Sequence, residues 1–163
     1  MLEPWLEKKL QERESAHLLR KLVTTKGLVD FTSNDYLGLS HSEKLFQNIT
    51  ERINHLGLHE NGAGGSRLLS GNTTYTEEIE NKLAGIFNTS AALIFNSGYA
   101  ANLAVLSSLP QRNDTILYDE LSHACMKDGA RLSLAKRLSF KHNDLNDLEA
   151  KLRKSSGRIY IAV

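Results

Sequence analysis

The sequence predicts an α/β protein in which a mostly parallel β-sheet is flanked by helices. From residue 92 to residue 163, short apolar runs alternate with longer segments that carry apolar residues at helical spacing. This alternation is typical of βαβ units, which place parallel strands in one sheet and helices on its faces. Of the 163 residues, 40% are hydrophobic and 24% are charged, as in an ordinary globular domain.

The charge balance excludes several classes of partner. Lys and Arg number 20 and Asp and Glu number 19, so the formal net charge is +1. Nucleic-acid tails and acidic interaction segments need a lopsided charge, so we expect no nucleic-acid partner. No apolar run approaches the roughly 20 residues of a membrane helix. The first residues contain acidic side chains and no apolar signal core, so we expect a cytoplasmic protein without a membrane partner.

Two features resemble metal or thiol sites but favour simpler interpretations. Cys125 is the single cysteine, so no disulfide framework or cysteine metal cluster can form, and we expect a small core residue. His55 and His59 have the spacing of two ligands on one helix face, without a third ligand nearby. We expect a solvated helix face there and no metal site.

The N-terminal part is predicted to contain two helices and a short strand. Residues 3–25 place leucines along one helical stripe, and Gly27 follows as a terminator. Residues 28–31 read as a short strand. Ser40-x-x-Glu43 is a capping box and predicts the start of a second helix. The apolar face of that helix consists of Leu45, Ile49, Ile53 and Leu56.

A glycine-rich loop separates this part from the alternating part. Five glycines occur between Gly57 and Gly71, which indicates sharp bends or a close backbone approach. Thr74-x-x-Glu77 is a second capping box, and a helix follows it. Strands are then predicted at 92–95, 115–118, 137–140 and 159–163, with helices at 98–109, 122–133 and 143–154. Because the sequence stops within an apolar, β-branched run, we expect a longer chain.

The turns after the strands are the expected places for a ligand, because open parallel sheets bind ligands at the carboxyl ends of their strands. The turn 96–99 contains Gly98 at a helix start, where free N–H groups and the helix dipole favour phosphate. An ordinary βα turn is the alternative. In the next turn, His123 could stack on a ring, carry a proton or hold a carboxylate; the alternative is a partly buried histidine that is hydrogen-bonded to backbone. The third turn, 142–144, is expected to be an N-cap.

Five motifs in order make the chain similar to a known family. They are Phe31-Thr-Ser-Asn-Asp-Tyr-Leu-Gly-Leu-Ser40, Gly62-Ala-Gly-Gly-Ser-Arg-Leu-Leu-Ser-Gly-Asn72, Asn96-Ser-Gly-Tyr-Ala-Ala-Asn102, Asp119-Glu-Leu-Ser-His-Ala124 and Phe140-Lys-His-Asn-Asp144. With these motifs the chain resembles the α-oxoamine synthases, a branch of the fold type I pyridoxal-phosphate enzymes. The resemblance runs from about Arg20 to Val163.

The resemblance implies a fold and an assembly. The chain would be the N-terminal part of the fold type I transferase large domain, incomplete as it stands. Residues 1–40 would form an N-terminal helix and short strand segment, and residues 41–163 the first part of the cofactor-binding large domain. The complete enzyme would be a homodimer with active sites at the subunit interface. In such enzymes the strand matching 92–95 pairs with the last strand of the sheet, so we expect it to lack its neighbour and the chain to fold stably only with the remainder.

The resemblance also implies a cofactor and its contacts. Ser97, Gly98 and Tyr99 match positions that meet the phosphate of pyridoxal phosphate. His123 matches the histidine that stacks on the pyridine ring and helps to hold the substrate carboxylate. Substrate binding is implied for Arg20, Asn34 and Ser66, in addition to His123. The alternative for Arg20 is a solvated helix face.

The family condenses an amino acid with an acyl-CoA, loses CO2 and releases an amino ketone. The loop 62–72 is most similar to the members that join L-alanine to a pimeloyl thioester, on CoA or a carrier protein, in biotin synthesis. Other members differ in the amino acid and acyl chain. No lysine here matches the one that binds the cofactor covalently, so the resemblance implies no catalytic residue in this chain and no activity of the chain alone. A non-catalytic partner subunit and a generic phosphate-binding module are the alternatives.

Overall fold

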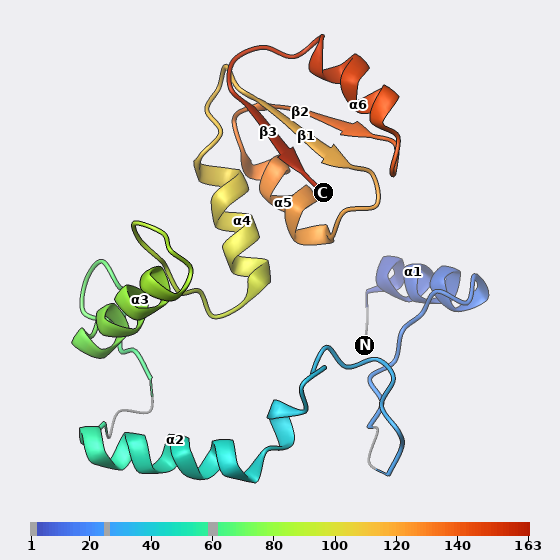
Figure 1. Ribbon diagram of the computed structural model, residues 1–163. Coiled ribbons are helices and arrows are strands. Elements are labelled where there is room, and N and C mark those ends of the chain that lie inside the picture. The colour runs from blue at the N-terminus through green and yellow to red at the C-terminus, as the bar shows by residue number, and fades with distance from the viewer. Residues whose placement is uncertain (1–2, 25–26, 59–61) are drawn as a thin grey trace. The chain divides into compact units, whose positions relative to one another are not determined.

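Figure 1 shows the computed structural model of the chain, which describes residues 3–24, 27–58 and 62–163. Contacts divide the chain into two compact units, Met1–Gly62 and Ala63–Val163, and each is described by itself. This division lies later in the sequence than the domain boundary at residues 40 and 41 that the family resemblance implies. That boundary stays a prediction.

The first unit contains less regular structure than the sequence predicts. Helix α1 spans Pro4–Ser15 and ends ten residues before the predicted end at residue 25. The helix stops because His17 adopts a left-handed backbone with φ of 56°, which reverses the chain direction. The predicted strand at 28–31 is also wrong. There the Asp30 carboxylate accepts hydrogen bonds from the backbone N–H groups of Thr32 and Ser33, which forms a turn.

The second helix forms where it was predicted but begins at a different cap. A short 3₁₀ turn, η1 at Leu39–His41, precedes α2 at Glu43–Leu56. The cap is Ser42, whose hydroxyl accepts from the N–H of Leu45, and not the predicted Ser40. The Ser40 hydroxyl is instead bonded to the Asp35 carboxylate. His55 is exposed on this helix, as expected for a solvated face, whereas His59 lies outside the described residues.

The second unit begins with the predicted glycine-rich loop. A Cβ atom at Gly71 would lie 1.9 Å from the carbonyl oxygen of Gly65, so the loop closes on itself only with glycine there. Helix α3 follows at Thr74–Ile86. Its cap is Thr73, which accepts from the N–H of Thr76 at 3.1 Å, one residue before the predicted Thr74.

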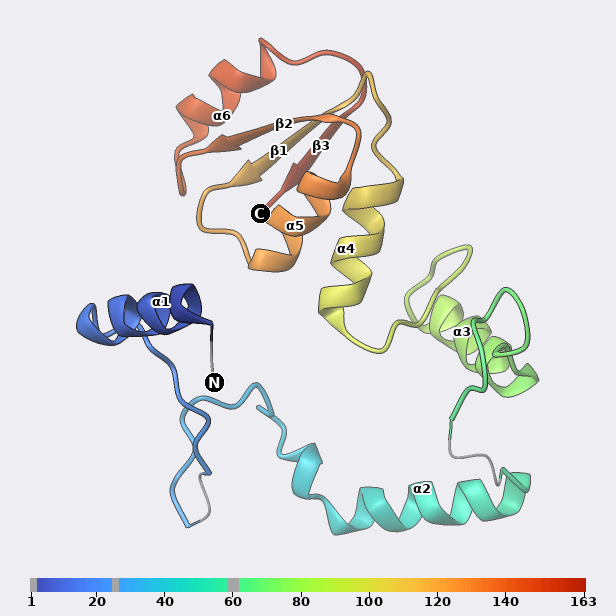
Figure 2. The ribbon, with the colours of Figure 1, turned by 180° about the vertical axis from the view of Figure 1, so that it is seen from behind.

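The sheet confirms the predicted α/β architecture. Strands β1 (Thr115–Asp119), β2 (Lys136–Phe140) and β3 (Ile159–Ala162) are all parallel, in the order β2-β1-β3. Helices α4 (Gly98–Ser108), α5 (Ala124–Leu132) and α6 (Leu145–Leu152) alternate with them, as predicted to within a few residues. Figures 1 and 2 show α4 and α5 on one side of the sheet and α6 on the other.

The core lies between the sheet and the first two of these helices. Ile116 in β1 is fully buried against Leu106 of α4 and Ala130 of α5, with Ala135 and Ala162 beside them. This packing fixes the carboxyl end of β1, and therefore the turn that leads into α5.

The predicted strand at 92–95 does not form. In the described part of the chain, residues 92–95 pair with no strand of the sheet. The N–H of Ile94 instead donates to the Glu80 carboxylate at 2.7 Å. Leu93 stays 64% exposed.

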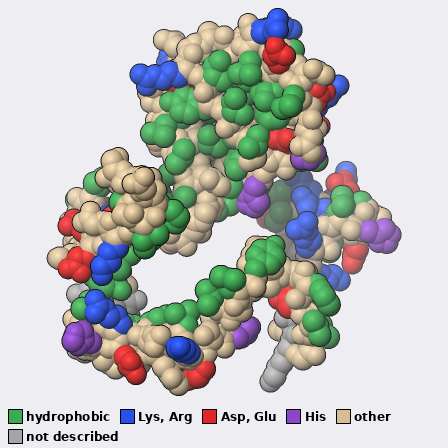
Figure 3. Space-filling model, in the orientation of Figure 1, with side chains coloured by type: hydrophobic (Ala, Val, Ile, Leu, Met, Phe, Trp, Pro, Cys, Tyr) green, Lys and Arg blue, Asp and Glu red, His purple; other side chains and the backbone are tan. Residues whose placement is uncertain are grey.

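Among the described residues, no helix combines the length and the apolar character that crossing a membrane requires. Apolar side chains do gather on parts of the surface, including α2, where Phe46 is 66% exposed (Figure 3).

Candidate functional site

Two helices begin side by side in the second unit, and both are capped by residues that the sequence singled out. The Ser97 hydroxyl accepts from the N–H of Ala100 at 3.1 Å and caps α4. The His123 ring caps α5 through Nδ1. Gly129 allows the two helices to approach closely, because a Cβ atom there would lie 2.8 Å from Cβ of Leu106.

The start of α4 offers unbonded donors to an anion. The first helical hydrogen bond runs from the N–H of Ala101 to the carbonyl of Ser97, at 3.1 Å. The N–H groups of Gly98 and Tyr99 lie ahead of that bond, at the positive end of the helix dipole. Ser97, Gly98 and Tyr99 are all exposed. A donor set of this kind fits a phosphate group.

Tyr99 joins the two helix starts. Its ring meets that of His123 edge to face, with centroids 6.2 Å apart and an interplanar angle of 80°. Its hydroxyl donates to Asp128 Oδ2 of α5 at 2.6 Å. That hydrogen bond raises the pKa of Tyr99 and lowers the pKa of Asp128. Asp128 is bonded in turn to Arg131, at 3.0 Å.

The ring of His123 is hydrogen-bonded to backbone, as one of the two interpretations predicts, but the residue is exposed and not partly buried. Its Nδ1 accepts from the N–H of Cys125 at 3.2 Å and lies 3.0 Å from Cys125 Sγ. The side-chain amide of Asn102 in α4 reaches the same sulfur at 3.3 Å. Cys125 is 2% exposed, which confirms the predicted small core residue.

Ser66 lies in the glycine-rich loop, which an ion pair holds in place. Arg67 binds the Glu80 carboxylate through both terminal nitrogens, at 2.6 and 2.9 Å, and also contacts Asn72. This pairing, with the N–H of Ile94, lowers the pKa of Glu80 to about 2. The same carboxylate therefore fixes the loop and the segment that precedes Ser97. A cavity of about 580 Å³ lies between them.

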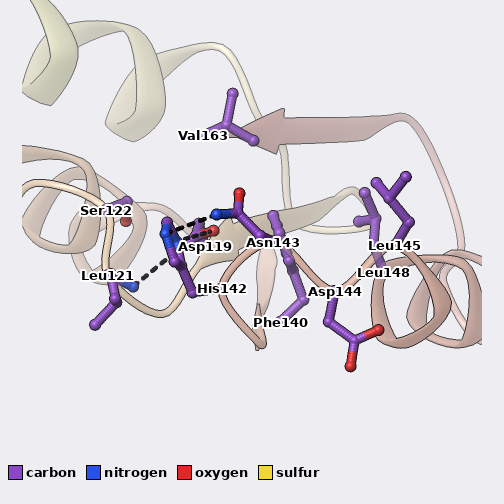
Figure 4. A pocket seen from close by; sticks show the side chains of 10 residues that line it. All are labelled: Asp119, Leu121, Ser122, Phe140, His142, Asn143, Asp144, Leu145, Leu148 and Val163. Atoms are coloured by element: carbon purple, nitrogen blue, oxygen red, sulfur yellow. Dashed lines mark hydrogen bonds and ion pairs between the residues drawn. The ribbon is translucent and has the colours of Figure 1, made fainter.

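A second cavity, of about 350 Å³, lies at the carboxyl edge of the sheet (Figure 4). His142 Nδ1 is 3.0 Å from both carboxylate oxygens of Asp119. Burial alone would raise the pKa of Asp119, but hydrogen bonds from Leu121 and His142 outweigh it and lower that pKa. Asp144 caps α6 by accepting from the N–H of Asp147 at 2.9 Å, which confirms the predicted N-cap in this turn.

The structure therefore brings together Ser97, Gly98, Tyr99 and His123, all at neighbouring helix starts. Arg20 and Asn34 are exposed residues of the first unit, and their roles stay predictions. Sequence reasoning missed Asn102, Asp128 and the Asp119–His142 pair. The strand register pairs Asp119 with Phe140, two residues before His142, so strand alignment could have found that last pair.

Comparison with known proteins gives one family and several relatives. The family model for aminotransferase class I and II matches residues 26–163. A putative 8-amino-7-oxononanoate synthase of Bacillus licheniformis is 44% identical over 158 residues, which are 96% of this chain and 41% of that protein. The chain spans about two fifths of the length of the curated relatives it matches.

Two solved structures share the fold. An 8-amino-7-oxononanoate synthase of Francisella tularensis has a TM-score of 0.59 and 34% identity, over 77% of this chain and 34% of that one. A serine palmitoyltransferase of S. paucimobilis, with a bound PLP–myriocin aldimine, has a TM-score of 0.68 and 23% identity, over 93% of this chain and 42% of that one. The second likeness shows the fold alone. Together they confirm the predicted fold, of which this chain covers a part.

Proposed function

We propose a function from the premise that the chain belongs to the aminotransferase class I and II family. Its residues form part of a pyridoxal-phosphate site in an enzyme that makes 8-amino-7-oxononanoate. The substrates are L-alanine and a pimeloyl thioester, carried by CoA or by a carrier protein. One observation carries the cofactor assignment: the adjacent starts of α4 and α5 place phosphate donors beside a histidine ring.

The phosphate group is assigned to the start of α4. The N–H groups of Gly98 and Tyr99 would donate to its oxygens, and Ser97 shapes the turn by capping the helix. Asp128 holds the Tyr99 hydroxyl and so fixes the first turn against α5. Pyridoxal phosphate, when bound, supplies an electron sink for bonds at the α-carbon of an amino acid.

His123 is assigned to the face of the cofactor ring and to the substrate carboxylate. Its ring is exposed at the start of α5, and its cap bond to the N–H of Cys125 holds it in a defined orientation. A positioned donor on a carboxylate orients the bonds around the neighbouring carbon. Arg20 is assigned to a substrate carboxylate through its guanidinium, and Asn34 and Ser66 to the substrate and acyl channel.

The catalytic lysine is assigned to a part of the enzyme other than these residues, because no lysine of this chain lies in the family's motif. The chain alone is therefore expected to be inactive. Residues 41–163 would be the first part of the cofactor-binding domain, after an N-terminal segment at 1–40. The working form would be a cytoplasmic homodimer.

Another α-oxoamine synthase is the second candidate, with glycine C-acetyltransferase, 5-aminolevulinate synthase and serine palmitoyltransferase as the forms to test. These forms share the condensation chemistry and differ in the amino acid and the acyl chain. A non-catalytic partner subunit is the third.

The decisive experiment assays the protein at its natural length, after an intact-mass measurement has fixed that length. L-alanine with pimeloyl-CoA is compared with glycine and acetyl-CoA, glycine and succinyl-CoA, and serine and palmitoyl-CoA. We expect release of CoA only with alanine and the pimeloyl thioester. Turnover of another pair alone would assign another branch, and no turnover with co-purification of a longer homologue would assign the partner subunit.

A matched variant tests the role of His123. His123→Asn keeps a side-chain acceptor for the α5 cap, since asparagine is a good N-cap residue, but removes the ring. A hydrogen bond to a charged group is worth about 1.5–3 kcal/mol, so we expect kcat/KM for alanine to fall about 10- to 150-fold with folding unchanged. An unchanged kcat/KM would contradict the assignment.

A further inference from the structure

The Nδ1 atom of His123 has two neighbours that decide where the ring proton resides. The backbone N–H of Cys125 points at it from 3.2 Å. A backbone amide only donates, so this hydrogen bond forms when Nδ1 presents its lone pair, and it favours the state in which Nδ1 carries no proton. The remaining proton of a neutral imidazole then resides on Nε2.

The side chain of Cys125 adds to this arrangement. Its Sγ lies 3.0 Å from the same Nδ1, and the side-chain amide of Asn102 lies 3.3 Å from Sγ. Because the amide nitrogen donates to sulfur, the thiol is free to direct its own proton at Nδ1. Cys125 is 2% exposed, so its thiol lies away from water. Asn102, Cys125 and His123 therefore form one chain of hydrogen bonds, in which Asn102 donates to Cys125 and Cys125 donates to His123.

We propose that Cys125 is a positioning residue, which, with its own backbone N–H, holds His123 as the neutral Nε2–H tautomer. The ring then offers the site one donor, Nε2–H, in an orientation that the cap bond and the edge-to-face contact with Tyr99 fix. This inference rests on the proposed function for its consequence: the donor meets the substrate carboxylate.

The tautomer can be read directly by NMR of the protein at its natural length, labelled with [¹⁵N]histidine. His123 is assigned by the signal that His123→Asn removes. At mildly alkaline pH we expect Nδ1 to resonate as an unprotonated ring nitrogen and Nε2 to show a bound proton. A proton on Nδ1, or signals averaged between two tautomers, would overturn the proposal.

Two substitutions separate the thiol from the backbone donor. Cys125→Ser keeps a side-chain proton for Nδ1 and should keep the single tautomer. Cys125→Ala leaves the backbone donor alone, so we expect the ring signals to move toward the tautomer average and the KM for the amino acid to rise several-fold, with kcat less affected. Unchanged ring signals in Cys125→Ala would overturn the role of Cys125.

The two proposals fail separately. The ring signals need neither cofactor nor substrate, so the expected tautomer in a protein that does not turn over alanine and pimeloyl-CoA would contradict the proposed function alone. The reverse result, turnover with the proton on Nδ1, would contradict the inference alone. A thermal melt of each variant verifies that the protein is folded during the measurement.

Discussion

Similar apolar side chains are buried in the second unit of the chain and exposed in the first. In the second unit Ile116 is fully buried beneath α4 and α5, whereas in the first unit Ile53 of α2 is 41% exposed. None of the described residues up to Gly62 is buried. The elements of the second unit complete a core among themselves: β1 pairs with β2 and with β3, and Ile116 packs beneath α4 and α5. The stripe on α2 is also apolar, but its residues Leu45, Ile49 and Ile53 are exposed.

The largest expected effect comes from shortening the same side chain in each unit. Ile116→Ala leaves a cavity beneath two helices, and we expect it to lower the free energy of unfolding by about 2–5 kcal/mol. Ile53→Ala removes atoms that already contact water, and we expect a change within about 0.5 kcal/mol. Urea unfolding of the protein at its natural length, followed by circular dichroism, measures both. Equal losses would show that α2 packs as tightly as the sheet, and would break the comparison.

Replacing either of two glycines by alanine is expected to change the stability by a smaller amount, and in opposite directions at the two positions. At Gly129 a new Cβ would lie 2.8 Å from Cβ of Leu106, so Gly129→Ala must push α4 and α5 apart, at a cost of about 1–3 kcal/mol. At Gly85 in α3, a Cβ would meet nothing within 4 Å. Gly85→Ala should therefore stabilise by about 0.4–1 kcal/mol, because it restricts the unfolded chain. Thermal melts compare the two, and stabilisation by Gly129→Ala would contradict the close packing of the helices.

The same contrast explains what could be predicted from the sequence. The strands predicted at 115–118 and 137–140 form because β1 and β2 pair with each other and the turns between them lie nearby in the chain. The run at 92–95 has the composition of a buried strand, but composition does not show whether a partner strand is present. Caps were misplaced by one or two residues because equivalent side chains compete, as when Asp35 binds the hydroxyl of Ser40 and leaves Ser42 to cap α2.

The same distinction, between local features and contacts made by packing, applies to the residues of the candidate site. Ser97, Gly98 and His123 could be found because turns after strands are local features of a sequence. The bonds from Tyr99 to Asp128 and from Asn102 to Cys125 join α4 to α5, and they depend on how closely Gly129 lets the helices approach. Contacts of that kind follow from packing geometry, which periodicity alone does not specify.

The smallest expected effect concerns a region that polar bonds organise instead of a core. Glu80 joins the glycine-rich loop to the segment at 92–96 through Arg67 and the N–H of Ile94. Its pKa is lowered from 4.5 to about 2, so the folded protein stays ionised there while the unfolded chain binds a proton. The stabilisation is fully present above pH 4.5 and is lost as the pH falls toward about 2.

Glu80→Gln removes this titration and keeps the size of the side chain. We expect the wild type to be the more stable protein near neutral pH, and its advantage over Glu80→Gln to shrink as the pH falls through that window. Glu78→Gln, at an exposed glutamate of the same helix, is the matched control and should follow the wild type. Urea midpoints measured at stepwise lower pH give the comparison. If wild type and Glu80→Gln lost stability in parallel, the loop would be held by packing, and the polar junction would contribute nothing to it.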